Sequence, residues 1–486
     1  MKNASIGRSK FVDRYKLWGP EQKTASKELK KTKAVHNLDF IRISFPDQHG
    51  ILRGKTIVAD ELGSALENGV GMVTTLLAKD TSHKTVLPWF TRGGGLEMEE
   101  MTGGGDFLMV PDPTTFRILP WAEKTGWILA DIYFPNGKPV PFSTRQILRN
   151  ALNELGDAGY NYLSGLEVEF HLFKLEDPKL KPDNAKQPAD PPEVSLIAHG
   201  FQYLTEQRMD EIEPYLELLR KNLIELGLPL RTLEVEFGPS QIEITFKPDV
   251  GLTTADNMVL FKSAVKQVAR RQGLHATFMC RPNLPNLFSS GWHLHQSLIN
   301  KKNNTNAFTP KKTGDILSPV GLKFVAGLLK HARPTALFST PTINGYKRYQ
   351  PYSLAPDRAL WGKDNRGAML RVISNTNDPA TRIENRIGEP AANPYLYLAS
   401  QIFSGLDGLN SNLKPGVPVD APYDTDADPL PVSLEEALGC LEKSDYFRKK
   451  MGNQFVDYLL KIKKAEVARF LSTVTDWEHK EYFEIF

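Results

Sequence analysis

The chain has 486 residues, enough for two or more domains with a large core, and 41% of them are hydrophobic and 24% charged. The formal net charge of +3 excludes a strong electrostatic attraction to nucleic acid or to a membrane surface, so neither is a predicted partner. The two cysteines, Cys280 and Cys440, exclude a disulfide framework and a cysteine zinc site.

The N-terminal part of the sequence is polar and rich in lysine, with neither a signal peptide nor an apolar run of transmembrane length. We therefore expect a soluble, cytoplasmic protein. Residues 1–36 are interpreted as a basic extension or surface helix, because runs of charge usually stay in water. Two strands are predicted around the turn 46–50, then a helix from Asp60, as its cap, to Asn68.

Short strands are predicted between Asp106 and Asp131, and the Pro-Asn-Gly-Lys-Pro run at 135–139 marks a domain boundary. The predicted division is 1–36, 37–138 and 139–486. Beyond the boundary, the elements expected from periodicity and end signals are a helix from a Ser143 cap to Leu155, an exposed loop over 176–193, helices over 210–226, 254–272 and 319–329, and a helical C-terminal part from Ser433. Strands and helices mix without regular βαβ spacing, which predicts an α+β fold with antiparallel sheet.

The segment 165–173 alternates polar and apolar residues over the length of a strand. Side chains two apart in a strand share a face, so Glu167, Glu169 and His171 are predicted to point the same way. Two neighbouring carboxylates repel each other unless a cation lies between them or one holds a proton. The pattern indicates a site for Mg²⁺ or Mn²⁺, although a solvated outer strand face would show the same alternation.

Similar patterns recur in later segments, which favours a lined active-site channel over unrelated wet strands. The segments 232–237 and 241–246, joined by the turn 238–240, carry glutamates in alternation. The segment 291–298 places His293 and His295 on one strand face. The segment 382–386 puts Glu384 between two arginines, all on one side if the chain is extended.

Several short motifs follow one another in the order of a known family: Gly165-x-Glu167-x-Glu169-Phe170, Glu236-x-x-x-x-Gln241-x-Glu243, His293-x-His295-x-Ser297, Asn344-Gly345-Tyr346-Lys347-Arg348, Asn365-Arg366, Arg382-Ile383-Glu384-x-Arg386 and Ala392-Asn393-Pro394-Tyr395. In this order they resemble the glutamine synthetase superfamily, from about residue 38 to beyond residue 410. The resemblance implies an N-terminal β-grasp domain and a catalytic domain with a curved antiparallel sheet. It also implies a dodecamer of two hexameric rings, with each active site between neighbouring subunits.

The resemblance further implies that ATP phosphorylates the γ-carboxylate of L-glutamate and that an amine then displaces phosphate. It assigns Glu169, Glu236 and Glu243 to a metal ion near glutamate, and Glu167, His293 and Glu384 to a metal ion that bridges the ATP phosphates. The other roles it implies are glutamate clamps at Arg348 and Arg386, a γ-phosphate contact at Arg366, and ATP-side residues at Arg371, Arg382, His295 and Ser297. Glu234 is interpreted either as a residue that supports the metal ligands or as one that is simply solvated or paired.

Two positions depart from the pattern of the members that use ammonia. Leu354 stands where those enzymes carry a flap glutamate, and the N-terminal segment 71–77 lacks the aspartate that they contribute to a neighbouring subunit. A pocket lined by Leu354, Tyr352, Val73 and Met72 would favour an apolar group, and an arylamine is largely neutral at pH 7. The sequence thus predicts a γ-glutamyl-amide ligase for an organic amine, with an aromatic amine such as aniline as the first candidate. A different flap alignment, with Asp357 as the acid, is the alternative.

A third departure lies before the histidine strand, where Phe288 and Ser289 replace an Asn-Gly pair that contacts substrate glutamate in the family. Phe288 is therefore a candidate substrate contact, and glutamate stays favoured because Arg348 and Arg386 are present. Three other hypotheses remain: glutamine synthesis from ammonia, a non-catalytic structural relative, and a phosphoryl-transfer enzyme that uses another acid. The structural relative is disfavoured because all six predicted metal ligands are intact.

Overall fold

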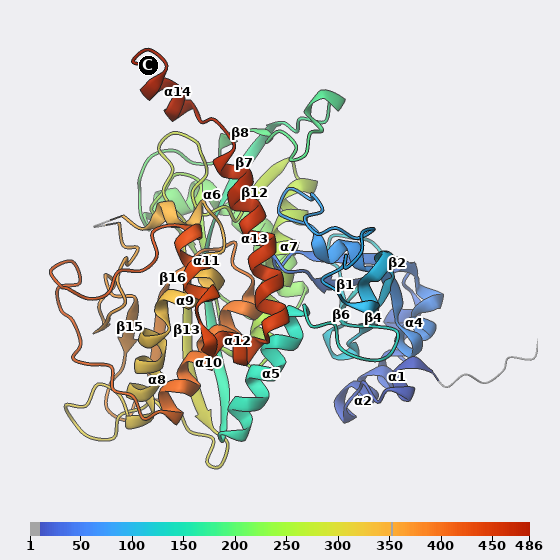
Figure 1. The fold of residues 1–486 in the computed structure, drawn as a ribbon, viewed down its shortest axis with the longest axis horizontal. Helices are drawn as coiled ribbons and strands as arrows, with labels where there is room; N and C mark the ends of the chain where they lie inside the picture. Colours follow the sequence, from blue (N-terminus) through green and yellow to red (C-terminus); the bar gives the residue numbers. More distant parts are fainter. Residues whose placement is uncertain (1–9, 351–352) are drawn as a thin grey trace, which may run out of the picture.

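The N-terminal part of the molecule is built on a small sheet. The computed structural model describes residues 10–350 and 353–486. The small sheet has six strands in the order β2-β1-β6-β4-β3, with β5 beside β6, and only β1 and β6 run parallel. Its elements are α1 (Phe11–Arg14), α2 (Pro20–Leu29), α3 (Lys33–His36), β1 (Phe40–Pro46), β2 (Leu52–Val58), α4 (Leu62–Asn68), β3 (Val70–Val73), β4 (Asp106–Pro111), β5 (Arg117–Ile118) and β6 (Thr125–Tyr133). Figure 1 shows this part, in blue, beside the larger body.

The larger body contains a second, curved sheet of ten strands in the order β14-β15-β16-β13-β7-β10-β9, and β8, β11 and β12 also pair with β7. Its strands are β7 (Tyr160–Asp177), β8 (Glu193–Leu196), β9 (Leu230–Val235), β10 (Gln241–Phe246), β11 (Asp249–Val250), β12 (Leu274–Thr277), β13 (Trp292–Asn300), β14 (Trp361–Lys363), β15 (Leu370–Ile373) and β16 (Arg382–Gly388). All pairs are antiparallel except β14 with β15. The expected α+β architecture, a small N-terminal sheet followed by a curved antiparallel sheet, is confirmed.

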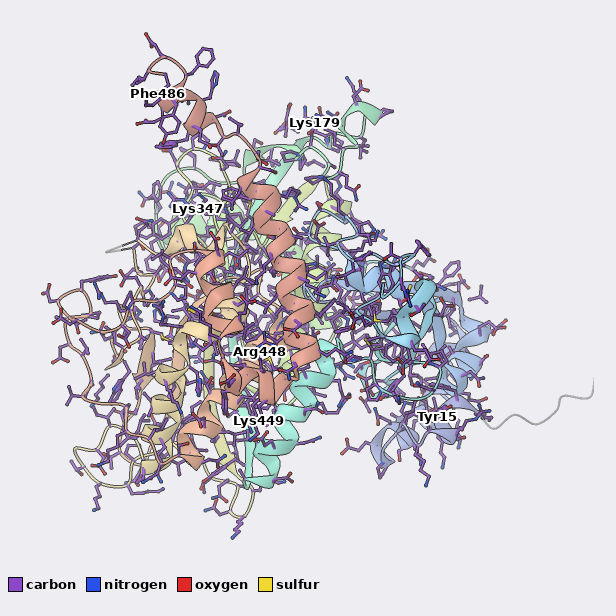
Figure 2. The ribbon with its side chains drawn as sticks, in the orientation of Figure 1. Tyr15, Lys179, Lys347, Arg448, Lys449 and Phe486 are labelled. Atoms are coloured by element: carbon purple, nitrogen blue, oxygen red, sulfur yellow. The ribbon has the colours of Figure 1, made fainter. Side chains whose placement is uncertain are left out.

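Helices pack around the large sheet. They are α5 (Thr144–Asp157), α6 (Glu206–Glu225), α7 (Thr253–Arg271), α8 (Pro319–Lys330), α9 (Ala332–Ser339), α10 (Pro394–Asn410), α11 (Leu434–Glu442), α12 (Asp445–Met451), α13 (Asn453–Leu471) and α14 (Asp476–Tyr482). Helix α10 contacts α5, α7, α8 and α9, and it is buried along almost its whole length. Figures 1 and 2 show α14, with Phe486 at its end, projecting from the body. Among the described residues, no helix combines the length and apolar character needed to cross a membrane.

The alternation of β7 is explained by what each face contacts. Val168 and Phe170 are fully buried, and the Phe170 ring lies 6.0 Å from that of Phe261 on α7, so the apolar face packs on this helix. The opposite face carries Glu167 and Glu169. A one-residue slip of this strand would exchange the two faces, so the packing on α7 fixes which side the carboxylates occupy.

Polar contacts hold the small sheet against the larger body. Arg145 on α5 is buried and bonds Asp112, which follows β4, and Asp131 on β6, each at 2.9 Å. The same guanidinium donates to both carboxylate oxygens of Asp256 on α7 at 3.0 and 2.8 Å. The Tyr458 hydroxyl of α13 donates to the carbonyl oxygen of Leu77 at 2.6 Å. These contacts fix the position of the small sheet relative to the strands of the site.

Two predicted helix starts had opposite outcomes. The Ser143 side chain accepts a hydrogen bond from the Gln146 amide, so its role as the cap of α5 is confirmed. The predicted Asp60 cap is wrong, because Asp60 lies inside a short 3₁₀ turn and α4 begins only at Leu62. The acidic pair at 60–61 fits the first turn of either helix type, so sequence alone could not place the boundary.

Candidate active site

Strand register brings most of the predicted metal ligands together on the large sheet. Strand β7 lies between β10 and β13, with Glu169 directly opposite Glu243 and Glu167 directly opposite His293. On the far side of β13, Glu384 of β16 lies opposite His295. Paired residues on antiparallel strands have neighbouring Cβ atoms, so these side chains must share one patch. Glu236 comes just after β9 and reaches the same patch from a loop, which corrects the prediction that it lies within a strand.

The contacts within this patch are close. The two carboxylate oxygens of Glu167 lie 2.5 Å from Nδ1 of His293 and 2.9 Å from Nε2 of His295. Oε1 of Glu384 lies 3.7 Å from Nδ1 of His293. Two triads offer ligand atoms within 4.8 Å of one another, Glu167 with His295 and Glu384, and Glu167 with Glu243 and His293. Oxygen atoms with an imidazole nitrogen suit Mg²⁺ or Mn²⁺, so the donor set fits divalent cations.

The pKa values of the glutamates show that the patch is short of positive charge. Burial, together with neighbouring carboxylates, raises the pKa of Glu169 to about 8, that of Glu236 to about 7 and that of Glu243 to about 10. Burial also opposes ionisation of Glu167 and Glu384, but His293 beside Glu167 and Arg386 beside Glu384 outweigh it and lower both pKa values. A divalent cation would supply the positive charge that is missing around Glu169, Glu236 and Glu243.

Mg²⁺ binding is therefore predicted to tighten as the pH rises. A carboxyl group with a raised pKa holds its proton below that pKa, and an entering cation must displace it. Between about pH 6 and pH 8 the affinity should rise about tenfold per pH unit for each proton displaced. Calorimetric titration of the metal-free protein in buffers of different ionisation enthalpy would count the released protons. An affinity that does not change over this range would contradict the shared carboxylate site.

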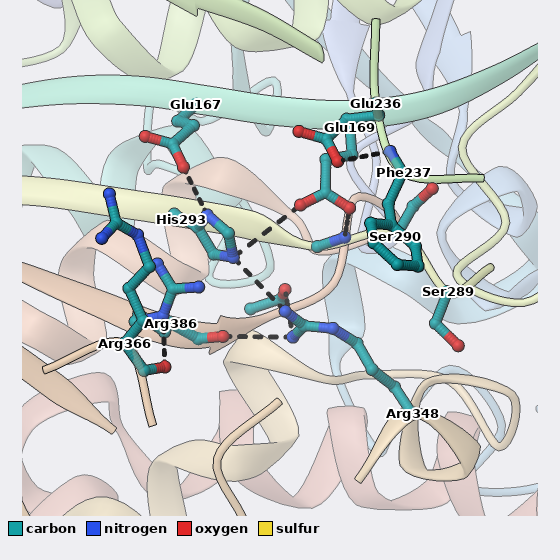
Figure 3. A network of polar contacts seen from close by, with 12 residues as sticks. Glu167, Glu169, Glu236, Phe237, Ser289, Ser290, His293, Arg348, Arg366 and Arg386 are labelled. Atoms are coloured by element: carbon teal, nitrogen blue, oxygen red, sulfur yellow. Dashed lines mark hydrogen bonds and ion pairs between the residues drawn. The ribbon is translucent and has the colours of Figure 1, made fainter. Parts of the chain in front are cut away.

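Guanidinium groups lie across His293 from the carboxylates of Glu167 and Glu169 (Figure 3). Figure 3 shows Arg348, Arg366 and Arg386 there, opposite Glu167 and Glu169. Arg348 donates to the carbonyl oxygens of Arg386 and Gly388 at 3.1 and 3.3 Å, and its Nη2 lies 3.4 Å from Nε2 of His293. Arg386 donates to Glu384 and, at 3.0 Å, to the carbonyl oxygen of Arg366.

Two further arginines lie on the neighbouring strands β15 and β16. Arg371 bridges Glu384 at 3.0 Å and Asp364 at 2.6 Å. Nε of Arg382 donates to Nδ1 of His295 at 3.2 Å, so His295 carries its own proton on Nε2 and donates to Glu167. Arginines beside carboxylates are the arrangement that phosphoryl transfer needs, because the transferring group is anionic and the cations are held by acids.

A single cavity of about 1160 Å³ connects the two groups of side chains. Among its described lining residues are these predicted site residues: Glu167, Glu169, Glu236, Glu243, His293, His295, Ser297, Arg348, Arg366, Arg371, Arg382, Arg386, Leu354 and Phe288. Glu234 also lines it. Glu384 is fully buried behind Arg371 and Arg386. The described lining residues all lie between Leu163 and Arg386, so Val73 of β3, which is 40% exposed, does not line the cavity of its own chain. Tyr352 lies outside the described residues.

Two loops of the cavity wall contribute no acid among the described residues. The segments 281–289, 348–350 and 353–354 line the cavity with Arg281, Leu287, Phe288, Ser289, Arg348, Gln350, Ser353 and Leu354. Leu354 is 54% exposed and adopts a left-handed backbone with φ of 58°. Asp357, the alternative acid, does not line the cavity, and its carboxylate lies 4.0 Å from Nε of Arg358.

Some site residues were not predicted from the sequence. Tyr203, Phe237 and Arg231 line the cavity, and Gln241 binds Oε2 of Glu169 at 3.1 Å. Phe237 follows Glu236 within a recognised motif, which could have flagged it, whereas Tyr203 sits in a loop without periodicity. His171 shares its strand face with Glu169 but is fully buried, with Nδ1 3.4 Å from Oγ of Ser290, so it lies behind the site.

Comparisons with known proteins agree with this geometry. The family model described as "Glutamine synthetase, catalytic domain" matches residues 141–482. A "Gamma-glutamylanilide synthase" from Acinetobacter sp is 44% identical over 98% of this chain and 99% of its own length, and a "Glutamate--isopropylamine ligase" from Pseudomonas sp is 34% identical over 93% and 96%. A solved structure described as a "GmaS/ADP complex" is 28% identical, with a TM-score of 0.77, and covers 95% of this chain and 99% of that one.

Proposed function

Since the chain belongs to the glutamine synthetase family and is similar to relatives named for joining glutamate to an amine, we propose that it uses ATP to join the γ-carboxylate of L-glutamate to an organic amine. The intermediate is γ-glutamyl phosphate. An aromatic amine such as aniline is the first candidate, supported by the 44% identity to a protein named for an anilide product.

In the first step, a γ-carboxylate oxygen of glutamate attacks the terminal phosphorus of ATP, and ADP leaves. Arg366 stabilises the transferring phosphoryl group, while Arg371, Arg382, His295 and Ser297 hold the remaining phosphates. Divalent cations, when held by Glu169, Glu236 and Glu243 and by Glu167, His293 and Glu384, would neutralise the phosphate charge. Arg348 and Arg386 orient the glutamate carboxylates.

In the second step, the amine nitrogen attacks the γ-carbonyl carbon, the carbon–oxygen bond to phosphate breaks, and a proton passes from the nitrogen to the leaving phosphate. An arylamine reaches this step largely neutral, whereas ammonium must first lose a proton to a base. The observation that carries the proposal is that the loops around Leu354 and Phe288 line the cavity without contributing an acid. Without a carboxylate there, a small cation has no preferred position, and an apolar neutral amine does.

The proposal is tested by ADP release with ATP, Mg²⁺ and L-glutamate across a panel of amines that includes ammonium. Release should require glutamate and should be fastest with an organic amine. If ammonium is the better substrate at equal concentration, the protein is a glutamine synthetase of the ammonia type. If another acid replaces glutamate, Phe288 has changed the acid rather than the amine.

Replacing Leu354 with glutamate is predicted to raise the kcat/KM for ammonium by roughly tenfold or more, because a carboxylate would attract the cation and accept its proton. The kcat/KM for an arylamine should fall in the same variant. Leu354→Gln, of equal size and without charge, is the matched control. If both variants leave the amine preference unchanged, Leu354 does not face the amine.

We further propose that the protein assembles into hexameric rings, two of which stack, so that Val73 lines the cavity of a neighbouring subunit. Support comes from the exposure of Val73 and from its absence among the described residues that line its own chain's cavity. Light scattering would give the mass of the assembly. Val73→Asp should lower activity with organic amines in an assembly of unchanged mass, and unchanged amine kinetics would contradict this placement.

A further inference from the structure

Four aromatic rings form a cluster at the cavity, next to the predicted metal ligand Glu236. The Phe237 ring lies 4.9 Å from the Phe288 ring, 5.8 Å from Phe201 and 6.2 Å from Tyr203, measured between centroids. Phe237, Phe288 and Tyr203 line the cavity, and Leu354 lines it as well. The rings are tilted or edge-on to one another, which are the arrangements that aromatic pairs prefer.

The loops that carry the central pair of this cluster are held in place. The Phe237 amide donates to Oε2 of Glu236 at 2.9 Å, and the Gly238 amide donates to Oε1 of Gln241 at 2.9 Å. A Cβ added at Gly238 would come within 2.8 Å of the Phe288 Cβ, so this glycine lets the loop after β9 pack directly against the loop before β13. These contacts hold the backbone of the two loops that carry the rings before any ligand arrives.

The cluster is also more exposed than a structural core would be. Phe237 is 42% exposed, and Phe201 and Tyr203 are exposed to a similar extent. Exposed apolar groups scattered singly over a surface need no explanation, but a contiguous group lining a cavity indicates a ligand surface. Phe237 is bonded through its own amide to the predicted metal ligand Glu236, so the exposed ring lies next to the reacting groups.

We propose that Phe237 and Phe288, flanked by Tyr203, form the wall on which the ring of an aromatic amine stacks, and that this wall selects arylamines over ammonia and small alkylamines. The inference rests on the proposed function and specifies its amine. The arene packs on the two phenyl rings, and its amino group points toward the γ-carbonyl carbon held near Glu236. Phe288 stands where the family resemblance places a polar residue, and it supplies the second ring of the wall.

The wall is tested by comparing an aromatic nucleophile with a small neutral one. Phe237→Ala should lower kcat/KM for aniline by roughly 10- to 100-fold, mainly through KM, because a lost aromatic contact and its apolar burial are together worth that much. Hydroxylamine is small and largely neutral near pH 7, and its kcat/KM should fall at least about tenfold less in this variant than that of aniline. Phe237→Tyr, which keeps the ring, should retain aniline activity.

Phe470 on α13 supplies a matched control, because it is a phenylalanine of nearly equal exposure, 41%, outside the cavity. Phe470→Ala should leave kcat/KM for both aniline and hydroxylamine unchanged. Phe288→Leu should lower kcat/KM for aniline as Phe237→Ala does. If Phe237→Ala and Phe288→Leu use aniline as well as Phe470→Ala does, the wall is wrong while the ligase function stands. If the wild type forms hydroxamate but no anilide, the aromatic substrate is wrong. If it forms neither product, the proposed function itself fails.

Discussion

Replacing Glu384 with glutamine is expected to lower glutamate-dependent ADP release by at least about 100-fold, because removing a single charged partner of a transition state typically costs this much. Glu384 is fully buried between Arg371, at 3.0 Å, and Arg386, and its Oε1 lies 3.7 Å from His293. The amide has nearly the same shape, so the substitution removes the charge without opening a cavity. The change should also weaken Mg²⁺ binding, as measured by calorimetry.

Glu234→Gln is the matched control for this variant. Glu234 lines the same cavity and lies directly opposite Glu243 on the neighbouring strand, but the family pattern gives it no metal. Its replacement should change ADP release and Mg²⁺ affinity by only a few fold. If the two variants behave alike, either Glu384 holds no metal or Glu234 does, and the assignment of ligands to strands would have to be revised.

Replacing Arg145 with methionine is expected to destabilise the protein by about 3–5 kcal/mol, the usual effect of removing one partner of a buried ion pair. The guanidinium is buried and bonded to Asp112, Asp131 and Asp256, and these three carboxylates would then repel one another. Burial alone would raise the pKa of Asp131, but Arg145 and Arg149 outweigh it and lower that pKa. The expected result is a lower urea midpoint at pH 7.

The pH dependence of this loss has a definite sign. A carboxyl with a lowered pKa adds stability above its unfolded value, and that stability disappears as the pH falls through the folded value. The difference between wild type and Arg145→Met should therefore shrink in acid. Arg149→Met should cost much less, because Arg149 on the same helix is partly exposed and pairs with one carboxylate, that of Asp131, besides its hydrogen bond to Gln146. Equal midpoints for the two variants would contradict the role of Arg145 in joining the small sheet to the larger body.

The alternation of polar and apolar residues predicted several strands of the fold and the strand faces that form the site. In β7 and β10 it predicted both the strand and the face that bears glutamate, because a period of two leaves a strand with one apolar side that must pack. The order of motifs then linked strands far apart in the chain. The strand predicted from alternation was too long at Glu236, because β9 ends at Val235 and the next residues turn toward β10. His171 shows another limit, because sharing a strand face does not decide whether a side chain reaches the cavity.

Of the aromatic cluster, the sequence predicted Phe288 as a site residue but did not predict Phe237 or Tyr203. Phe237, Phe288 and Tyr203 come from three loops, and loop conformation depends on contacts such as that of Gly238 with Phe288 rather than on periodicity. Leu354 was identified from the family pattern alone, and the structure adds that it lines the same cavity. Alternation therefore predicted site residues on strands, whereas it gave no signal for a loop residue such as Tyr203.

The central claim is that this chain uses ATP to couple glutamate to an organic amine in preference to ammonia. The most direct test incubates the protein with ATP, Mg²⁺, L-glutamate and equal concentrations of aniline and ammonium, and identifies the products by mass. We expect γ-glutamylanilide in excess over glutamine, with one ADP released per amide formed. Glutamine as the main product, or ADP release without any amide, would contradict the claim.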